Sequence, residues 1–492
     1  MLLVKEAVIG LDIGTSSVKA AIFLTTGEQL SIAESTYGFS TPHPGWCEQD
    51  PDHVWHVTVR TMRAMLEQAG PDISPVGMAV ASQSGTLVPV DAEGNPVYPG
   101  ITWMDGRTDE LVKEWFAQSR DQSVRDISGW HIHAGLPLAT IAWLRDHNPS
   151  VFKATQRWLC MNDYITYKLT QVYATNPSNG GVTQLMEVSF PNWSQALCDL
   201  AGAVPDQLSP IVPGGMLLGT ITSDSGAQIG LPVGMPVICG GHDQSCTALA
   251  LGVLHPGQML LACGTSWVIT GIVTAPDVSA VPDSMDLNYH ATANLWTISQ
   301  SLGGLGASLE WLVNQCWGEL PTRSDRYQAL DEELRLTQPG SDGLVFIPMA
   351  GGHTAPAGMQ RGGFVNLHLG HGRAHMARAV MESAAFELRL ALEAQLNAEA
   401  LWMFGGATRS SIWHSIVADV TGLPLRVTQC AHLPAIGAAV MASIGIGAYG
   451  NVEEAQRCFT STSMLSRTFH PNPLRRAIYT DSYVHYRNVV AS

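Results

Sequence analysis

The same short pattern opens each half of this 492-residue chain. Near the start, an apolar run at residues 8–13 leads into Gly14-Thr15-Ser16, and a second apolar run follows at residues 18–24. In the second half, residues 257–273 have the form strand, turn, strand around Cys263-Gly264-Thr265-Ser266. Glycine and hydroxyl residues between two apolar runs are typical of a tight hairpin turn. The repetition predicts two related domains that face a shared cleft, and the chain is long enough for them.

Signals for strands and helices alternate in both halves. Asp50-Pro51 marks a helix start, because a capping side chain precedes a proline in the first turn. Helical patterns are also predicted at residues 138–147, 303–316 and 373–396, and apolar strands at residues 76–90 and 401–404. These elements predict an α/β protein with a boundary near Gly252, which divides the chain into residues 1–251 and 252–492.

Charge and composition exclude several classes of partner. The chain has 26 Lys and Arg against 42 Asp and Glu, a net charge of −16, so neither nucleic acid nor an anionic membrane is expected as the main partner. Only 14% of the residues are charged and 46% are hydrophobic, which indicates large buried cores rather than disorder. The uncharged residues 433–452 contain Pro434 and four glycines, so a buried helix followed by a turn is a better interpretation than a membrane span.

The cysteines indicate a reducing compartment. There are nine of them, an odd number, and no two have the CxxC spacing. This distribution is typical of reduced, scattered thiols rather than of a disulfide framework or a zinc site. Lys5 and Glu6 stand where a secretory signal would need an apolar run. We therefore expect a cytoplasmic protein.

Three segments combine glycine with groups that can bind a ligand. At Asp12-Ile13-Gly14-Thr15-Ser16, a hairpin tip can direct N–H and O–H donors to a phosphate and the aspartate can hold Mg²⁺ through water; the alternative is an ordinary turn. Asp243 follows two glycines and can act as a general base or cap a helix. Gly405-Gly406 can lie flat against a nucleobase or phosphate, or form a plain loop between strand and helix.

From end to end the chain resembles the FGGY family of carbohydrate kinases. That family has the duplicated ribonuclease-H-like fold of actin and hexokinase, with a cleft between the two domains. Both parts of the family signature are nearly complete, at residues 135–144 and 362–382, although Thr140 replaces the usual lysine and Asn366 the usual glycine. The other matching motifs follow in the family's order: the two Gly-Thr-Ser hairpins, Trp46-Cys47-Glu48-Gln49-Asp50-Pro51, Trp103-Met104-Asp105-Gly106-Arg107, Asn162-Asp163-Tyr164, Gly405-Gly406 and Ala435-Ile436-Gly437-Ala438-Ala439.

The resemblance implies an ATP-dependent kinase that phosphorylates a sugar hydroxyl with the help of Mg²⁺. Asp243 would be the catalytic base and Asp12 the acid linked to the metal. The implied sugar contacts are Gln83, Ser84, Trp103, Asp105 and Asp243. The implied ATP contacts are Gly14, Thr15, Ser16 and Lys19 in the sugar and phosphate domain, and Gly264, Thr265, Gly405, Gly406 and Arg409 in the nucleotide domain. The expected partners are the sugar and MgATP, and a homodimer is expected.

Several departures from the family pattern affect the choice of sugar. Ser84-Gly85 stand where xylulose kinases have Met-His and glycerol kinases have Arg-Glu. Asn176 replaces a usual aspartate, and Gly351-Gly352-His353 replaces Gly-Glu-Arg. The segment Trp103 to Arg107 is most similar to xylulose-kinase-like members, which favours a ketopentose such as xylulose. Ribulose, a tetrulose, gluconate and glycerol are the alternatives.

Two other classes of function compete with a sugar kinase. One is a nucleotide switch of the actin or chaperone kind that binds proteins, and the other is a degenerate protein that binds ligands without turnover. The discriminating feature is Asp243 after Gly241-His242, because a kinase needs an acid directed at a substrate hydroxyl.

Overall fold

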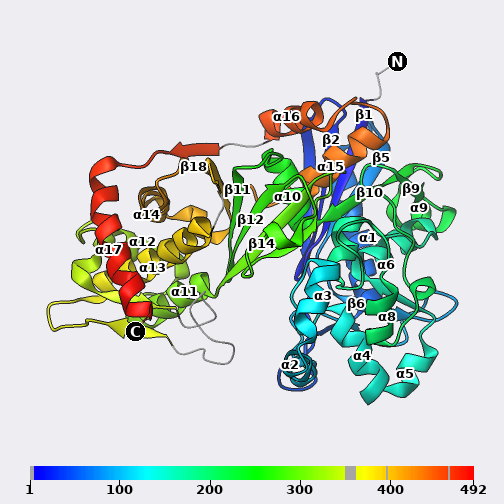
Figure 1. Cartoon of the computed structure of the whole chain (residues 1–492). Helices are drawn as coiled ribbons and strands as arrows, with labels where there is room; N and C mark the ends of the chain where they lie inside the picture. The colour runs from blue at the N-terminus through cyan, green and yellow to red at the C-terminus, as the bar shows by residue number, and fades with distance from the viewer. Residues whose placement is uncertain (1–4, 349–361, 395–396, 464–465, 492) are drawn as a thin grey trace.

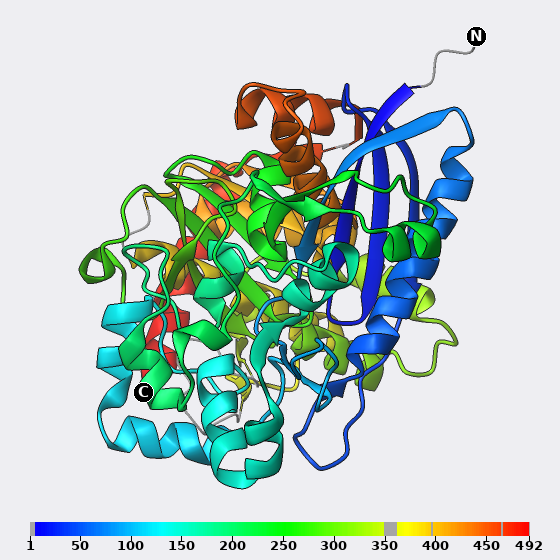
Figure 2. The same ribbon diagram turned by 90° about the vertical axis from the view of Figure 1, so that its right-hand side faces the viewer.

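The computed structural model describes residues 5–348, 362–394, 397–463 and 466–491. Two mixed β-sheets, one from each half of the chain, lie side by side with helices on their faces (Figures 1 and 2). This arrangement confirms the expected two-domain α/β fold. Gly351, Gly352 and His353, where the sequence departs from the family pattern, lie outside the described residues.

The first sheet has six strands, in the order β3 (Gln29–Thr36), β2 (Ser17–Leu24), β1 (Lys5–Ile13), β5 (Ile73–Ser82), β10 (Pro236–His242) and β9 (Leu217–Thr220). The strands β1, β2 and β3 form an antiparallel meander, whereas β1, β5 and β10 run parallel. The predicted strand at residues 76–90 is in fact two strands, β5 and β6 (Leu87–Val90), because the chain turns at Gly85 with a φ of +80°.

The second sheet repeats the plan of the first. Its seven strands have the order β13 (Asp286–Tyr289), β14 (Trp296–Gly303), β12 (Trp267–Val273), β11 (Gln258–Cys263), β17 (Ala400–Phe404), β18 (Leu425–Thr428) and β19 (Ser466–Phe469). The five strands from β14 to β18 have the same order and relative directions as β3, β2, β1, β5 and β10. The fold is therefore a duplication, and the two Gly-Thr-Ser turns occupy equivalent places in it.

Smaller sheets and helices surround these two layers. A four-stranded sheet has the order β4 (Glu48–Gln49), β7 (Gly100–Ile101), β6 and β8 (Arg157–Cys160), and β15 (Val345–Ile347) pairs with β16 (Gly363–Val365). The helices of the N-terminal half are α1 (Pro51–Ala69), α2 (Asp109–Ala117), α3 (Arg120–Ser128), α4 (Pro137–His147), α5 (Pro149–Ala154), α6 (Met161–Thr170), α7 (Pro177–Val182), α8 (Gln195–Ala201), α9 (Ser223–Ile229) and α10 (Asp243–Leu251). The C-terminal half has α11 (Leu305–Cys316), α12 (Arg323–Leu334), α13 (Arg373–Glu393), α14 (Ser411–Thr421), α15 (Leu433–Gly445), α16 (Val452–Ser463) and α17 (Pro473–Ala491).

Two helices cover opposite faces of the first sheet. Side chains alternate between faces along a strand, so Ile9 packs in the core beside α1 while Val8 packs in the core beside α15. Asp50 caps α1 as predicted, because its side chain accepts the N–H groups of Asp52 and His53. In Figure 1, α15 lies beside β1 and β5. A Cβ on Gly10 would be only 1.8 Å from a main-chain oxygen of α15, so only glycine allows this contact.

The helix α15 confirms the prediction of a buried helix within residues 433–452. Residues 433–445 form a helix whose middle is buried between the sheets rather than a span. In the described parts of the chain, no helix is both long enough and apolar enough to cross a membrane. All nine cysteines are free thiols.

Candidate active site

Three parallel strands of the first sheet end together, and acids stand at two of these ends. In the strand register Asp12 lies beside Ala81, and His242 lies beside Ser82. Asp243 follows as the first residue of α10. Neighbouring strands are about 4.8 Å apart, so Asp12 lies about 10 Å from the end of β10, two strands away. The carboxyl ends of parallel strands are where ligands bind in open α/β sheets.

Asp12 is a buried acid with few partners. Its side chain is 5% exposed, and among the described residues its one ion-pair partner is Lys19, with Nζ 4.0 Å from Oδ2. Burial raises the pKa of Asp12 to about 7; the positive charge of Lys19 opposes this rise, and the negative charge of Asp243 adds to it. Lys19 also lies 3.6 Å from Glu34.

The chemistry of these side chains fits Mg²⁺. In sites that bind a nucleotide, this ion keeps several waters and takes only one or two carboxylates from the protein, together with substrate phosphates. Asp12 offers a carboxylate of this kind, and a bound cation would stabilise its ionised form. In the described part of the chain, no three His, Cys, Asp or Glu side chains group together as a metal site made by protein alone.

Asp243 has one carboxylate oxygen occupied and one open. Its Oδ1 accepts the N–H of Gln244 at 2.6 Å and lies 3.0 Å from Nε2 of His242. Its Oδ2 has no partner among the described residues, and the side chain is 30% exposed. Asp243 therefore begins a helix, as one interpretation of the sequence proposed, and also presents an open oxygen that can accept a proton.

Side chains from neighbouring loops hold the first hairpin turn. Gln49 donates from Nε2 to the main-chain oxygen of Thr15 at 2.7 Å, and Trp103 donates from Nε1 to Oγ1 of Thr15 at 3.2 Å. Gln83 in turn donates to Oε1 of Gln49 at 3.0 Å. The structure thus brings together residues that the resemblance assigns to the sugar and to ATP. Ser16 is exposed at the tip of the turn.

The short helix α7 connects the ends of β5 and β10. Ser84, after β5, donates its hydroxyl hydrogen to Oδ1 of Asn179 on α7. Ser178, the preceding residue, accepts the main-chain N–H of His242 at 2.9 Å. The sequence analysis did not single out Ser178 and Asn179. Asn176-Pro177, a capping residue before a proline, is the signal that could have located this helix.

Asp105 has a different environment from the other implied sugar contacts. Its side chain is fully buried, and Arg107 donates to Oδ1 from Nε at 2.7 Å and to Oδ2 from Nη2 at 2.8 Å. The N–H of Cys47 also donates to Oδ2, at 2.6 Å. This ion pair fixes the loop that carries Trp103. A direct contact between Asp105 and the sugar stays a prediction, and the buried placement does not favour it.

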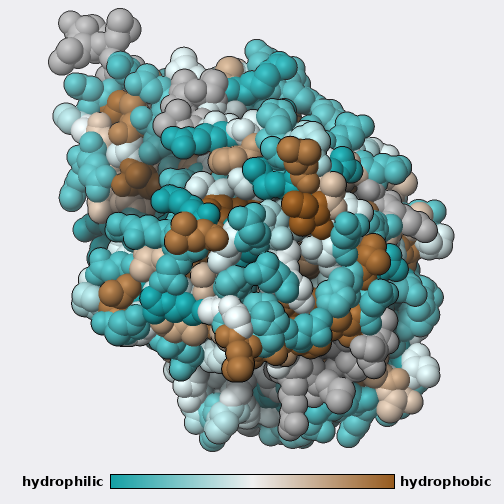
Figure 3. Space-filling view, turned by 90° about the vertical axis from the view of Figure 1, so that its left-hand side faces the viewer, coloured by the Kyte–Doolittle hydropathy of each residue, from teal (hydrophilic) through white to brown (hydrophobic). Residues whose placement is uncertain are grey.

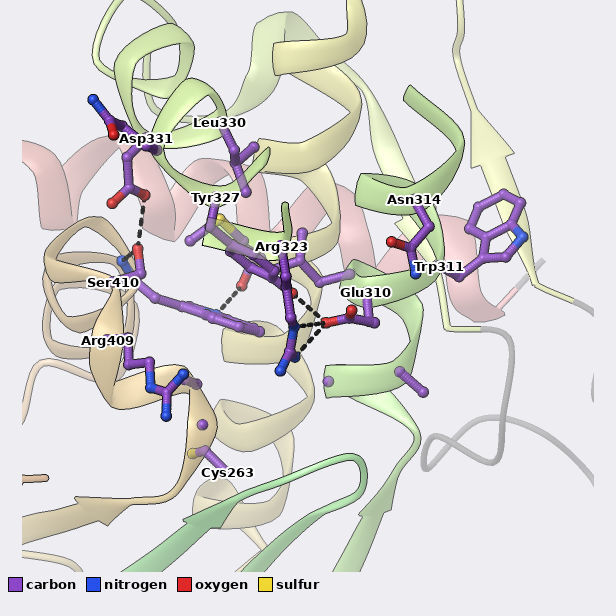
Figure 4. Close-up of a pocket in the computed structure, with 18 of the residues that line it drawn as sticks. Cys263, Glu310, Trp311, Asn314, Arg323, Tyr327, Leu330, Asp331, Arg409 and Ser410 are labelled. Atoms are coloured by element: carbon purple, nitrogen blue, oxygen red, sulfur yellow. Dashed lines mark hydrogen bonds and ion pairs between the residues drawn. The ribbon is translucent and has the colours of Figure 1, made fainter. Parts of the chain in front are cut away.

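A cavity of about 1040 Å³ lies in the C-terminal half, between α11, α12 and the loop after β17 (Figure 4). Four of the implied ATP contacts line it: Gly264 and Thr265 from the second hairpin turn, and Gly406 and Arg409 from the loop. The volume is at the upper end of the range for ligand pockets, about 300–1,000 Å³. The structure therefore gathers the implied nucleotide residues around one hollow.

The opposite wall of this cavity consists of residues that the sequence analysis missed. Figure 4 shows Arg323 and Tyr327 of α12 directed toward Glu310 of α11. Arg323 donates to Oε2 of Glu310 at 2.5 Å, and the Tyr327 hydroxyl donates to the same oxygen at 2.7 Å. On the other side Ser410 donates to Asp331 at 3.2 Å. These pairs join α11, α12 and the loop after β17 into one frame.

Gly405 does not line the cavity but sets the path of the loop that does. Its φ is +101°, and a Cβ there would lie 2.8 Å from the main-chain oxygen of Cys263. A residue with a side chain would be strained by both the conformation and this contact. Gly306 has a similar role, since a Cβ there would lie 2.0 Å from the oxygen of Gly264.

Comparisons with known proteins match both halves of this architecture. The model for the N-terminal domain of the FGGY family of carbohydrate kinases matches residues 7–250, and the model for its C-terminal domain matches residues 259–446. The chain belongs to the FGGY family of carbohydrate kinases. This FGGY protein is therefore a sugar kinase, and ATP is the phosphate donor of its family.

Relatives of this FGGY kinase cover nearly its whole length. An autoinducer-2 kinase of Enterobacter sp. (strain 638) is 29% identical over 96% of this chain and 91% of its own. The L-xylulose/3-keto-L-gulonate kinase of Escherichia coli (strain K12) is 26% identical over 98% and 96%. The solved xylulose kinase from Rhodospirillum rubrum has a TM-score of 0.90 at 27% identity, over 99% and 98%. Plasmodium falciparum glycerol kinase with ADP shares the fold, with a TM-score of 0.86 at 18% identity over 99% of both chains.

Proposed function

We propose that this FGGY kinase transfers the γ-phosphoryl group of ATP to a hydroxyl of a ketopentose such as xylulose, with Asp243 as general base. The observation that carries the proposal is the open Oδ2 of Asp243 at the strand ends where Asp12 and Gln83 also stand. In this proposal residues 1–251 hold the sugar and the phosphates, and residues 252–492 hold the nucleotide.

Each group in the proposed reaction has a defined task. Oδ2 of Asp243 accepts the proton of the sugar hydroxyl. At the same time the hydroxyl oxygen of the sugar bonds to the γ-phosphorus, and the bond between the γ-phosphorus and the β,γ-bridging oxygen breaks, so that ADP leaves. Thr15 and Thr265 at the two hairpin turns donate to the phosphates, where charge spreads in the transition state. Asp12 holds Mg²⁺, which supplies neutralising charge for the phosphates when bound. Arg409 and Gly406 line the nucleotide side.

The sugar side of the site suits a neutral substrate with many hydroxyl groups. Gln83, Ser84 and Asn179 there are uncharged, and the acids Asp12 and Asp243 would repel the carboxylate of a sugar acid. Oε1 of Gln83 and Nδ2 of Asn179 are buried and have no partner among the described residues. An acceptor and a donor left open in this way suit hydroxyl groups, which both donate and accept. This favours a ketose over gluconate.

A cytoplasmic location and a homodimer belong to the same proposal. The free cysteines support a reducing compartment. Figure 3 shows exposed apolar side chains among hydrophilic ones on the C-terminal half, and Leu336 and Leu474 are 84% and 79% exposed. The molar mass in solution, measured by light scattering, tests the dimer.

The experiment that tests the function is a substrate panel. Consumption of MgATP is measured with xylulose, ribulose, a tetrulose, glycerol, gluconate and autoinducer-2, and the phosphorylated product is identified by mass spectrometry. We expect turnover with a ketopentose and none with gluconate. ATP consumption that ignores every sugar would support the nucleotide switch, and sugar binding without turnover would support the degenerate binding protein.

The role of Asp243 is tested in the same assay. D243N keeps the shape of the side chain but removes the base, and we expect kcat to fall about 10²- to 10⁴-fold while MgADP still binds. D199N, at an exposed position on α8, is the matched control and should behave like the wild type. Wild-type turnover by D243N would remove Asp243 from the mechanism.

A further inference from the structure

We propose that Gln49 is a positioning residue, which holds the turn at Thr15 so that the N–H of Ser16 faces the phosphates of ATP. The inference rests on the proposed function, in which this turn binds the phosphates, and adds a residue to it. Gln49 lies on β4 and is 2% exposed. Its Nε2 donates to the main-chain oxygen of Thr15 at 2.7 Å.

The geometry of the peptide unit makes this contact a control on a donor. The C=O of Thr15 and the N–H of Ser16 belong to the same peptide unit, which is planar and trans, so the two groups point in opposite directions. A side chain that holds the oxygen therefore also fixes the direction of the N–H. Gln49 is buried and Ser16 is exposed at the tip of the turn. The N–H of Ser16 is thus directed away from Gln49.

The turn has open donors that this orientation serves. In the described parts of the chain, the N–H groups of Thr15 and Ser16 donate to no protein acceptor. The hydroxyl of Tyr37 donates to the main-chain oxygen of Gly14, which fixes the N–H of Thr15 by the same geometry. Oγ1 of Thr15 accepts from Trp103 at 3.2 Å, which leaves the hydroxyl hydrogen of Thr15 free to donate. Successive N–H groups held in this way suit an anion.

A second amide connects Gln49 to the sugar side of the site. The main-chain oxygen of Thr15 can only accept, so the end of Gln49 that faces it is the NH₂ group, and Oε1 faces the other way. That Oε1 accepts from Nε2 of Gln83 at 3.0 Å, which uses the NH₂ group of Gln83 as well. Oε1 of Gln83 remains as a buried acceptor without a partner among the described residues. The chain of two amides therefore ends in an acceptor for a hydroxyl hydrogen of the sugar.

A purely structural role for Gln49 is the competing explanation. Gln49 is buried in β4, which pairs with β7, so a substitution can disturb this small sheet without acting on Thr15. The two explanations differ in what they require of the side chain. A positioning role requires a donor toward Thr15, whereas a packing role requires only the shape of glutamine.

The test compares Q49E with Q49M in steady-state kinetics with the best ketose and MgATP. An ionised glutamate has nearly the shape of glutamine and still accepts from Gln83, but it has no donor for Thr15; methionine has neither group. We expect both variants to lower kcat about 10- to 100-fold, because a donor to the phosphates is misplaced. The KM of the ketose should rise in Q49M and stay near the wild-type value in Q49E. The matched control is Q456M, because Gln456 is also a buried amide and donates to the main-chain oxygen of Ala250 at 3.1 Å, at the far end of α10 from Asp243.

The outcomes separate the two explanations. Wild-type kcat in Q49E would overturn the inference, because shape alone would then suffice, and so would an equal loss of kcat in Q456M. In the double variant Q49M/Q83M, we expect the loss of kcat/KM for the ketose to be smaller than the product of the two single losses, since the amides act as one chain. Losses that multiply would overturn the link to Gln83. A wild type that phosphorylates no ketose would instead overturn the proposed function. Thermal unfolding of each variant shows whether a loss of kcat is a loss of fold.

Discussion

Asp12 is buried, so its ionised form is costly in the folded protein. We therefore expect this FGGY kinase, when no cation is bound, to be less stable than a variant with an uncharged side chain at position 12. Its pKa rises from 3.8 to about 7, a difference of about three units. Each unit corresponds to about 1.36 kcal/mol, so ionising Asp12 in the folded protein costs roughly 4 kcal/mol more than in the unfolded chain. The unfolded chain loses this proton near pH 4, whereas the folded protein keeps it until about pH 7. The free energy of unfolding therefore falls as pH rises between these two values and then levels off.

The D12N variant separates this cost from the function of the residue. At pH 8 and without Mg²⁺, we expect D12N to raise the free energy of unfolding by about 2–4 kcal/mol, because it removes the buried charge. The gain should shrink as pH falls toward 4, because Asp12 is protonated in the folded protein there and carries no buried charge. The same variant should lose catalysis, since the amide is a poor ligand for the ion. Urea unfolding from pH 4.5 to 8, with and without MgATP, measures both effects.

Two comparisons make this test decisive. D481N removes an exposed carboxylate of α17 and should leave the pH dependence as in the wild type. MgATP should stabilise the wild type more than D12N, because the bound cation compensates the charge on Asp12. A D12N variant that is no more stable than the wild type at pH 8, or whose advantage does not change with pH, would refute the electrostatic reasoning.

Two further predictions concern the nucleotide loop and the contact between the halves. G405A should weaken MgADP binding in calorimetry and lower the free energy of unfolding by about 1–3 kcal/mol, whereas G447A, also at positive φ but with open space around it, should leave MgADP binding unchanged. Asp286 of β13 accepts the N–H of His131 at 2.9 Å and lies 3.2 Å from Nε2 of His133, both from the N-terminal half. Burial lowers the pKa of His133, but the hydrogen bond to Asp286 and the nearby negative charges, chiefly that of Asp286, together outweigh burial and raise the pKa overall. Protonated His133 therefore stabilises the fold at low pH, and this contribution is lost as pH rises through its pKa in the folded protein. In urea unfolding, D286N should therefore lower the free energy of unfolding more at pH 5.5 than at pH 8.5. A penalty that is larger at the higher pH would contradict this sign.

Local patterns predicted much of the fold. The two hairpins occupy equivalent places in the two sheets, because turn residues between apolar runs determine a hairpin without help from the rest of the chain. Asp50 caps α1 for the same reason. Asn366, where the family usually has glycine, has a φ of +63°, and asparagine is one of the few other residues that tolerate this conformation.

Contacts between residues far apart in the chain could not be predicted from local sequence patterns. The hydrogen bond between Ser84 and Asn179 joins residues 95 positions apart, and no local pattern indicates it. Arg323 and Tyr327 belong to a polar segment whose sequence is typical of an ordinary exposed helix. Only the tertiary structure places them on the wall of the cavity. Residues 213–241 are rich in glycine and proline, which are typical of loops. The sequence therefore did not indicate the strand β9 and the helix α9 in this segment.

Two parts of the chain have different proposed tasks: the duplicated sheets, and the segments that connect their strands. This difference explains why relatives with different named substrates share one fold. In the proposed mechanism, the phosphates and the proton are handled by Asp12, Asp243 and the two hairpin turns, which stand at the strand ends of the duplicated sheets. The groups proposed to meet the sugar come instead from the turn after β5, the loop that carries Trp103, and α7. These segments lie outside the repeated strands, so they can change without disturbing the acids. On this proposal we expect substrate choice in this chain to depend on Ser84, Gly85 and Asn179 rather than on the architecture shared with xylulose and glycerol kinases.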